Sequence, residues 1–129
     1  MAAVSFDELK QLVEINSYTF NKDGVDTHGS LFSMWMQDLG FSEERYYRET
    51  IGDHLLFRSP VVTNKRRILL LGHLDTVFPP GTFETFREDD EWVYGPGVCD
   101  MKGGNLIALQ ALRAIQHSAG GIANIDFLL

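Results

Sequence analysis

The chain has 129 residues, a formal net charge of -7 and 44% hydrophobic residues. This length is enough for one domain with a core and too short for two. The acidic balance argues against a nucleic-acid or anionic-membrane surface, so we expect neither kind of partner. A single cysteine, Cys99, excludes an internal disulfide. No apolar run has the length of a membrane span and the N-terminus lacks the form of a signal peptide, so we expect a cytoplasmic location.

Two amphipathic helices are expected in the first third of the chain. The segment Ser5-Phe6-Asp7-Glu8 has the form of a capping box with Ser5 as N-cap, and apolar spacing predicts a helix from there to about residue 15. A polar loop over residues 16–24 then precedes a second helix over residues 26–39, which Gly40 ends. The second helix carries an apolar stripe at helical spacing, typical of core packing: Leu31, Met34, Trp35 and Leu39.

Beyond residue 41 the hydrophobic period becomes that of strands. Residues 45–50 and 53–58 predict a hairpin with its turn at Gly52. Residues 68–71 are continuously apolar, which is typical of a strand covered on both faces. Residues 91–94 predict a further short strand.

The last third predicts a long helix and a final strand. Apolar residues spread around the helix expected over residues 101–117, which indicates burial on more than one side: Leu106, Ile107, Leu109, Leu112 and Ile115. Gly120 and Gly121 end that helix, and residues 122–129 predict a strand. Because the chain ends within this apolar run, we interpret it as a piece of a longer domain. The unpaired last strand would then let the piece associate with itself.

Helices that alternate with apolar strands predict an α/β fold, a layered domain with a central mixed β-sheet flanked by helices. In such sheets, functional sites gather at the carboxyl ends of strands. His73 and Asp75 follow the apolar run 68–71, and Asp100 precedes the long helix. These three residues are therefore the candidates for a site.

The three candidates are of the types that bind a divalent metal, which prefers neutral imidazole and ionised carboxylates. In an extended segment His73 and Asp75 project to the same side, so Asp75 can hydrogen-bond the ring of His73 while the other ring nitrogen binds a metal. Asp100 offers two oxygens and can bridge two ions. Each residue also has a structural reading: His73 as a surface or hydrogen-bonded histidine, and Asp100 as the N-cap of the helix.

Taken together, the segments around these residues resemble a known family. They read Gly72-His73-Leu74-Asp75-Thr76-Val77 and Tyr94-Gly95-Pro96-Gly97-Val98-Cys99-Asp100-Met101-Lys102-Gly103-Gly104. Both resemble the M20 family of metallopeptidases, the carboxypeptidase G2, acetylornithine deacetylase and aminoacylase group, and the Gly-Pro-Gly form is most similar to its glutamate carboxypeptidase branch. Residues 15–17, 21–25 and 39–41 are similar to the opening of that catalytic domain, so the resemblance covers essentially the whole chain.

This resemblance implies a fold and an organisation. Residues 1–129 would be the N-terminal portion of a single zinc-peptidase-like catalytic domain, truncated, with the remainder of that domain and the lid domain absent. The lid domain of this family often dimerises, which makes the parent protein a candidate homodimer.

The resemblance also implies an activity, that of a zinc-dependent amide or peptide hydrolase. The group includes carboxypeptidases, dipeptidases and N-acyl amino acid deacylases, so a small peptide or N-acyl amino acid is the expected substrate. His73 matches an imidazole zinc ligand, Asp100 the carboxylate that bridges two zinc ions, and Asp75 the catalytic-site aspartate that holds and tunes the histidine ring. Cobalt and manganese are alternatives to zinc. The Asp100–Met101 peptide bond is expected to be cis. The family's general base and remaining ligands come after residue 129, so we expect the piece to be inactive alone.

Two other functional readings stay open. A non-catalytic family member would keep the fold for binding or regulation, and would lack the Glu-Glu pair that the enzymes carry after the last strand here. An unrelated His/Asp phosphohydrolase would need its dyad on a helix, whereas His73 and Asp75 follow an apolar strand.

Five further residues receive no functional role from the sequence. Cys99 is more consistent with a small buried residue beneath the site than with a thiolate ligand. Lys102 is expected to face solvent or an acidic neighbour near the helix start. His28 and His54, like His117, lack a partner pattern.

Overall fold

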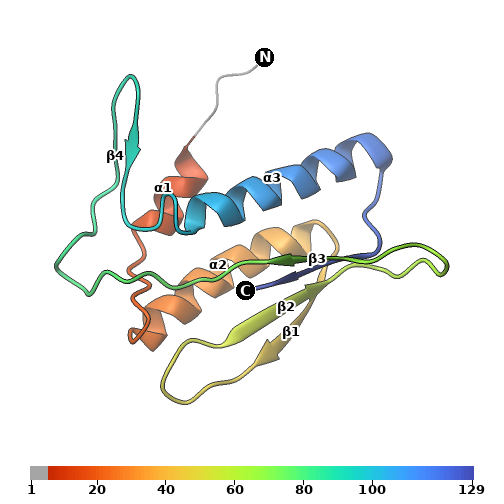
Figure 1. Cartoon of the computed structure of the whole chain (residues 1–129), viewed down its shortest axis with the longest axis horizontal. Helices are drawn as coiled ribbons and strands as arrows, with labels where there is room; N and C mark the ends of the chain where they lie inside the picture. Colours follow the sequence, from red (N-terminus) through yellow and green to blue (C-terminus); the bar gives the residue numbers. More distant parts are fainter. Residues whose placement is uncertain (1–5) are drawn as a thin grey trace.

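The computed structural model describes residues 6–129, so the proposed N-cap Ser5 lies outside the described residues. Figure 1 shows the helices grouped beside a twisted sheet, with a small hairpin extending away from it. In chain order the elements are α1 (Asp7–Val13), α2 (Lys22–Asp38), β1 (Ser42–Tyr46), β2 (His54–Arg58), β3 (Ile68–Leu71), β4 (Arg87–Glu88), β5 (Val93–Tyr94), α3 (Lys102–Ala119) and β6 (Ile125–Leu128).

The main sheet has four strands in the order β1-β2-β6-β3. β1 and β2 are antiparallel, as are β2 and β6, whereas β3 and β6 are parallel. β4 and β5 form a separate two-stranded hairpin. The predicted α/β fold with a central mixed sheet is therefore confirmed.

The predicted β1–β2 hairpin is present, but its connection is a longer loop than a tight turn at Gly52. β1 begins at Ser42 and its last residue, Tyr46, pairs with His54. The loop is held by Asp53, whose Oδ1 accepts hydrogen bonds from the backbone N–H of Arg48 at 2.8 Å and from Lys22 Nζ at 2.9 Å. The Arg48 N–H thus bonds to a side chain instead of to a neighbouring strand. The first strand therefore ends at Tyr46, earlier than residue 50 as predicted.

The last strand lies inside the sheet, between β2 and β3, so the prediction that it is an unpaired edge is wrong. The chain returns from α3 and inserts β6 beside β3, and Leu129 exchanges two backbone hydrogen bonds with Leu55, each of 2.8 Å. The strand at the edge of the sheet on this side is β3, which follows β6 in the strand order.

One face of the sheet carries the core. Phe57 and Phe127 point to this face from neighbouring strands, and Phe32 of α2 contacts both rings, with centroids 6.3 Å and 5.7 Å away. Leu109 and Leu112 of α3 belong to the same buried cluster. Because α2 and α3 pack on the same side, one layer of helices covers one face of the sheet.

The opposite face of the sheet is exposed within the part of the chain that the structure describes. Leu69 and Leu71 of β3 are 59% and 69% exposed, and Tyr46 of β1 is 49% exposed. The prediction that residues 68–71 are covered on both faces is therefore wrong for these residues. Leu69 and Leu71 are apolar although they lie on the face of the sheet that no described helix covers.

The helices also differ from their predicted bounds and buried faces. α2 begins at Lys22 rather than at residue 26, because the side-chain oxygen of Asn21 accepts a hydrogen bond from the N–H of Gly24 and caps the helix earlier. Met34 is 63% exposed, since the buried side of α2 carries Val25, Phe32 and Met36 instead. Ile107 of α3 is 73% exposed, and this helix is therefore buried on one side rather than several.

Glu8 holds α1 against α3. Its carboxylate accepts two hydrogen bonds from Arg113, of 2.6 Å from Nη1 and 2.9 Å from Nη2. Glu8, which the sequence predicted as part of a capping box, therefore forms an ion pair between two helices. The N-cap of α1 is Phe6, which makes no side-chain capping bond.

Candidate metal centre

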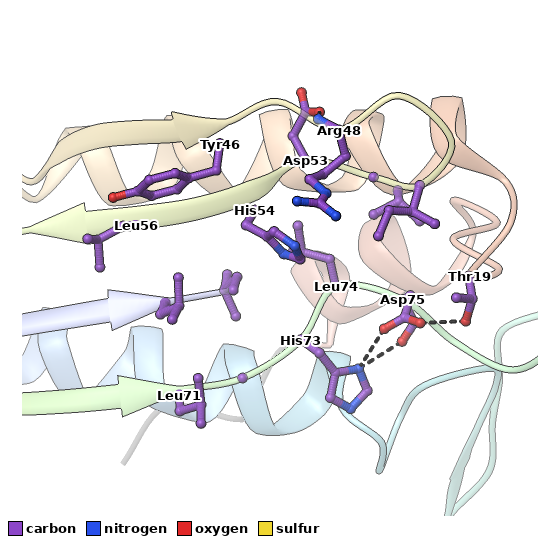
Figure 2. Close-up of a pocket in the computed structure, with 16 residues that line it drawn as sticks. Thr19, Tyr46, Arg48, Asp53, His54, Leu56, Leu71, His73, Leu74 and Asp75 are labelled. Atoms are coloured by element: carbon purple, nitrogen blue, oxygen red, sulfur yellow. Dashed lines mark hydrogen bonds and ion pairs between the residues drawn. The ribbon is translucent and has the colours of Figure 1, made fainter.

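The site begins where β3 ends. After Leu71 the backbone leaves the sheet at its carboxyl end and carries His73 and Asp75 to the same side, as the alternation of an extended segment predicts. His73 Nδ1 donates to the backbone oxygen of Asp75 at 3.0 Å and to its Oδ1 at 3.1 Å. Figure 2 shows the two side chains facing each other. The Asp75 group thus fixes the orientation of the imidazole ring and leaves Nε2 free to face another partner.

That partner is Asp100. Its Oδ1 lies 2.8 Å from His73 Nε2, although the two residues come from opposite ends of the long segment that includes β4 and β5. The side chain of Asp100 is 86% exposed, so its second oxygen faces solvent. The Asp100–Met101 peptide bond is cis, as the resemblance implies. The structure therefore brings all three sequence-predicted residues together.

The alternative reading of Asp100 as a helix cap is wrong. The N-cap of α3 is Met101, and this helix end has no side-chain capping bond. The carboxylate of Asp100 points instead to the imidazole of His73. The carboxylate of Asp100 thus contacts His73 and does not cap α3.

Lys102 anchors the segment that carries Asp100, and the expectation that it faces solvent is wrong. It is 1% exposed, and its Nζ donates to the backbone oxygens of Leu12 at 2.6 Å and Ile15 at 2.7 Å. Burial lowers the pKa of Lys102 to about 8. Gly97, at φ +80°, lies against this side chain, and a Cβ there would lie 3.1 Å from Lys102 Cγ. The start of α3 is therefore tied to the end of α1.

The electrostatics of His73 reflect its two acidic neighbours. Partial burial acts to lower the pKa of His73, but the hydrogen bond to Asp100 and that to the Asp75 carbonyl outweigh it, so the pKa is raised above its ordinary value. An imidazole nitrogen and a carboxylate oxygen that face each other, with the second ring nitrogen held by an acceptor, fit the donor set of a zinc ion. Among residues 6–129, no three His, Cys, Asp or Glu side chains are grouped closely enough to hold an ion, so the described residues supply a partial set of ligands.

Sequence reasoning missed Thr19, which lies in the loop between α1 and α2. Its Oγ1 donates to Oδ2 of Asp75 and, at 3.2 Å, to the backbone oxygen of Thr76. The loop also forms an isolated parallel bridge between Tyr18 and Thr76. No local pattern marks this residue, because its role depends on a contact between segments far apart in the chain.

Cys99 is exposed, so the expectation of a buried residue beneath the site is wrong. It precedes Asp100 in a short loop at the surface.

An open cavity of about 650 Å³ lies beside the site, on the exposed face of the sheet. Its walls are mostly apolar and include Tyr46, Leu56, Leu71 and Leu128, with His73 and Asp75 at one end. The candidate metal centre is thus continuous with the uncovered face of the sheet.

The fold matches that of solved dipeptidase and carboxypeptidase structures. Human carnosine dipeptidase 1 superposes with a TM-score of 0.80 at 20% identity, covering 94% of this chain and 30% of that chain. An M20 family metallo-carboxypeptidase, Sso-CP2 from Sulfolobus solfataricus, superposes with a TM-score of 0.77 at 16% identity, covering 94% of this chain and 29% of that chain. At 20% and 16% identity, these two structures show that the chain has the α/β fold of one part of each of them.

Sequence comparisons identify the family. A family model described as peptidase family M20/M25/M40 matches residues 69–128. Carboxypeptidase G2 of Pseudomonas sp. (strain RS-16) is 30% identical over 113 residues, which is 84% of this chain and 27% of that protein. Acetylornithine deacetylase of Photorhabdus laumondii is 35% identical over 119 residues, which is 84% of this chain and 31% of that protein. The chain belongs to the peptidase M20 family, and it spans about 30% of the length of these relatives.

The names of the relatives describe peptide and amide hydrolysis: a carboxypeptidase, an acetylornithine deacetylase and a cysteinylglycine-S-conjugate dipeptidase. Within residues 6–129, every helix is too short or too polar to cross a bilayer.

Proposed function

We propose that this chain supplies the first part of the catalytic domain of a zinc-dependent M20 hydrolase. His73 and Asp100 would be metal ligands, and Asp75 would be the catalytic-site aspartate that orients the ring of His73. The observation that carries the proposal is the pair of contacts on one imidazole: Nε2 lies 2.8 Å from Asp100 Oδ1 while Nδ1 is held by Asp75. Zinc bound there, or cobalt or manganese in its place, would supply a Lewis acid for polarising an amide carbonyl.

The proposed substrates are small peptides or N-acyl amino acids. The relatives include a carboxypeptidase, a deacetylase and a cysteinylglycine-S-conjugate dipeptidase, and the reaction common to these names is hydrolysis of an amide bond in a small amino-acid derivative. A catalytic zinc site uses three protein ligands and a water. Because the described residues bring two ligands together, the 129 residues alone are expected to be inactive and to bind zinc weakly.

Zinc titration of the purified chain tests the proposed ligands. We expect His73→Ala to weaken zinc binding at least about tenfold, because an imidazole ligand is lost. His117→Ala is the matched control, since His117 is exposed at the end of α3, and it should bind zinc like the unaltered chain. Equal affinities for both variants would contradict the assignment, and hydrolysis by the 129-residue chain would contradict its expected inactivity.

We further propose that the 129-residue chain associates with itself, through the free edge of β3 rather than through β6. An edge strand with exposed apolar side chains favours pairing with another chain. Leu69→Lys should shift the chain toward the monomer in light scattering, because Leu69 is 59% exposed on β3. Ile107→Lys, at a 73% exposed position on α3, is the control and should leave the association unchanged. A monomer at high concentration before any substitution would refute the proposal. The cytoplasmic location and a homodimeric parent stay predictions.

A further inference from the structure

Two buried polar side chains hydrogen-bond to the backbone segment that carries His73 and Asp75. His28 of α2 lies with Nδ1 2.8 Å from the backbone oxygen of Leu74, and since a carbonyl only accepts, Nδ1 carries the proton and donates. Asn105 of α3 donates from Nδ2 to the backbone oxygen of His73 at 2.7 Å. Both side chains are 0% exposed. Two helices therefore hold adjacent carbonyls of one short segment.

The packing around Asn105 shows how closely this segment is held. A Cβ on Gly72 would lie 2.2 Å from Asn105 Oδ1, so the amide group occupies the space that a side chain at position 72 would need. On the other side of the segment, the N–H of Thr76 donates to the backbone oxygen of Ser17 at 2.8 Å. The backbone that carries His73 and Asp75 is thus enclosed between α2, α3 and the loop after α1.

His28 and Asn105 are polar side chains at buried positions, where an apolar side chain would cost less free energy to bury. A buried polar atom is unfavourable unless it is hydrogen-bonded. Within residues 6–129, neither Nε2 of His28 nor Oδ1 of Asn105 has a hydrogen-bond partner. Each buried side chain therefore makes one hydrogen bond, and in both cases that bond goes to the segment between Gly72 and Asp75. Leucine at either position would fill the core without this penalty.

We propose that His28 and Asn105 are positioning residues, which fix the carbonyls of Leu74 and His73 and so keep the His73 ring turned toward Asp100. Neither side chain is among the proposed ligands, and both act through the backbone. The proposal rests on the proposed function for its purpose, because a fixed ring matters only if Nε2 of His73 binds a metal. The hydrogen bonds themselves can be tested without metal.

The test compares four variants of the full chain. His28→Leu and Asn105→Ala remove the two donors. His28→Asn keeps an amide N–H close to the position of Nδ1, and is the conservative rescue. Leu109→Ala, a buried position one turn further along α3, removes packing without touching the segment and is the control.

Two measurements are made on each variant at a temperature at which all are folded. The first is amide hydrogen exchange at Thr76 by NMR in metal-free buffer. The second is the affinity for Zn²⁺ alone, together with the visible absorption of bound Co²⁺. We expect His28→Leu and Asn105→Ala to speed exchange at Thr76 and to weaken zinc binding about tenfold, with an altered Co²⁺ spectrum. His28→Asn should restore both readouts, and Leu109→Ala should lower the melting temperature while leaving both unchanged.

The outcomes separate this inference from the proposed function. Unchanged exchange and unchanged zinc affinity in both donor-removing variants would overturn the positioning role, as would equal effects in Leu109→Ala. If His73→Ala binds zinc as well as the unaltered chain, the proposed ligand role fails, and exchange at Thr76 still decides whether the segment is held by these residues. If His28→Leu does not fold, Asn105→Ala and its control Leu109→Ala carry the same comparison.

Discussion

Replacing Lys102 with alanine is expected to lower the free energy of unfolding by about 3 kcal/mol, because the change removes both packing and hydrogen bonds. The side chain is 1% exposed, so its removal leaves a cavity between α1 and α3. The backbone oxygens of Leu12 and Ile15 also lose their bonds to Nζ, of 2.6 Å and 2.7 Å. Loss of the charged group relieves part of the burial penalty, which is why the expected effect stays below the sum of the two losses.

Urea unfolding measures this effect, and two further variants identify its source. Lys102→Met keeps most of the volume and should fall between the alanine variant and the unaltered chain. Lys10→Ala is the matched control on a surface lysine, since the side chains of the Lys10–Glu14 pair are 53% and 52% exposed, and it should cost well under 1 kcal/mol. A Lys102→Ala chain that unfolds at the same urea concentration as the unaltered one would show that this lysine does not hold α1 to α3.

Acidification from pH 7 to pH 5 is expected to lower the free energy of unfolding by about 2 kcal/mol through His28 alone. Burial, and then the positive charge of Lys102, lowers the pKa of His28 to about 3 from its ordinary value of 6.5. Between these two pKa values the unfolded chain binds a proton that the folded chain does not. The contribution of neutral His28 to stability is therefore complete above about pH 6.5 and is lost progressively as the pH falls toward 3.

The comparison that isolates His28 is urea unfolding of the unaltered chain and of His28→Asn at both pH values. Every other ionisable group is the same in both chains, so its contribution cancels in the difference. The unaltered chain should lose about 2 kcal/mol more than His28→Asn between pH 7 and pH 5. Equal losses in the two chains would mean that His28 is protonated in the folded state.

Local sequence patterns predicted most of the elements. The apolar run Ile68–Leu71 became β3 with the predicted bounds, and Gly120, at φ +72°, ends α3 as a C-cap glycine. The bounds of α2 were wrong because Asn21 caps the helix earlier than residue 26. The predicted tight turn at Gly52 was wrong because Asp53 holds a longer loop. Its carboxylate accepts hydrogen bonds from the N–H of Arg48 and from Lys22, which lies on α2. Errors of this kind arise wherever a side chain from elsewhere in the chain replaces a local hydrogen bond.

The candidate site was predictable to the extent that its residues carry their own chemistry. His73, Asp75 and Asp100 were identified from residue type, from alternation along an extended segment and from the resemblance of two motifs, and the structure places them in contact. The residues that support them were not. Lys102 has the appearance of a surface charge in sequence, and His28 that of a residue without partners, yet both are buried and bonded to backbone oxygens.

The sequence by itself determined the α/β fold class, most of the elements and the three side chains of the candidate metal centre, because period and residue type are local properties. Only the tertiary structure decided that β6 lies between β2 and β3, that one face of the sheet stays exposed, and that Thr19, His28 and Asn105 hold the segment after β3. The physical reason is that strand order and buried hydrogen bonds join residues far apart in the chain. Their energies depend on which groups share the interior, and no local window of sequence contains that information.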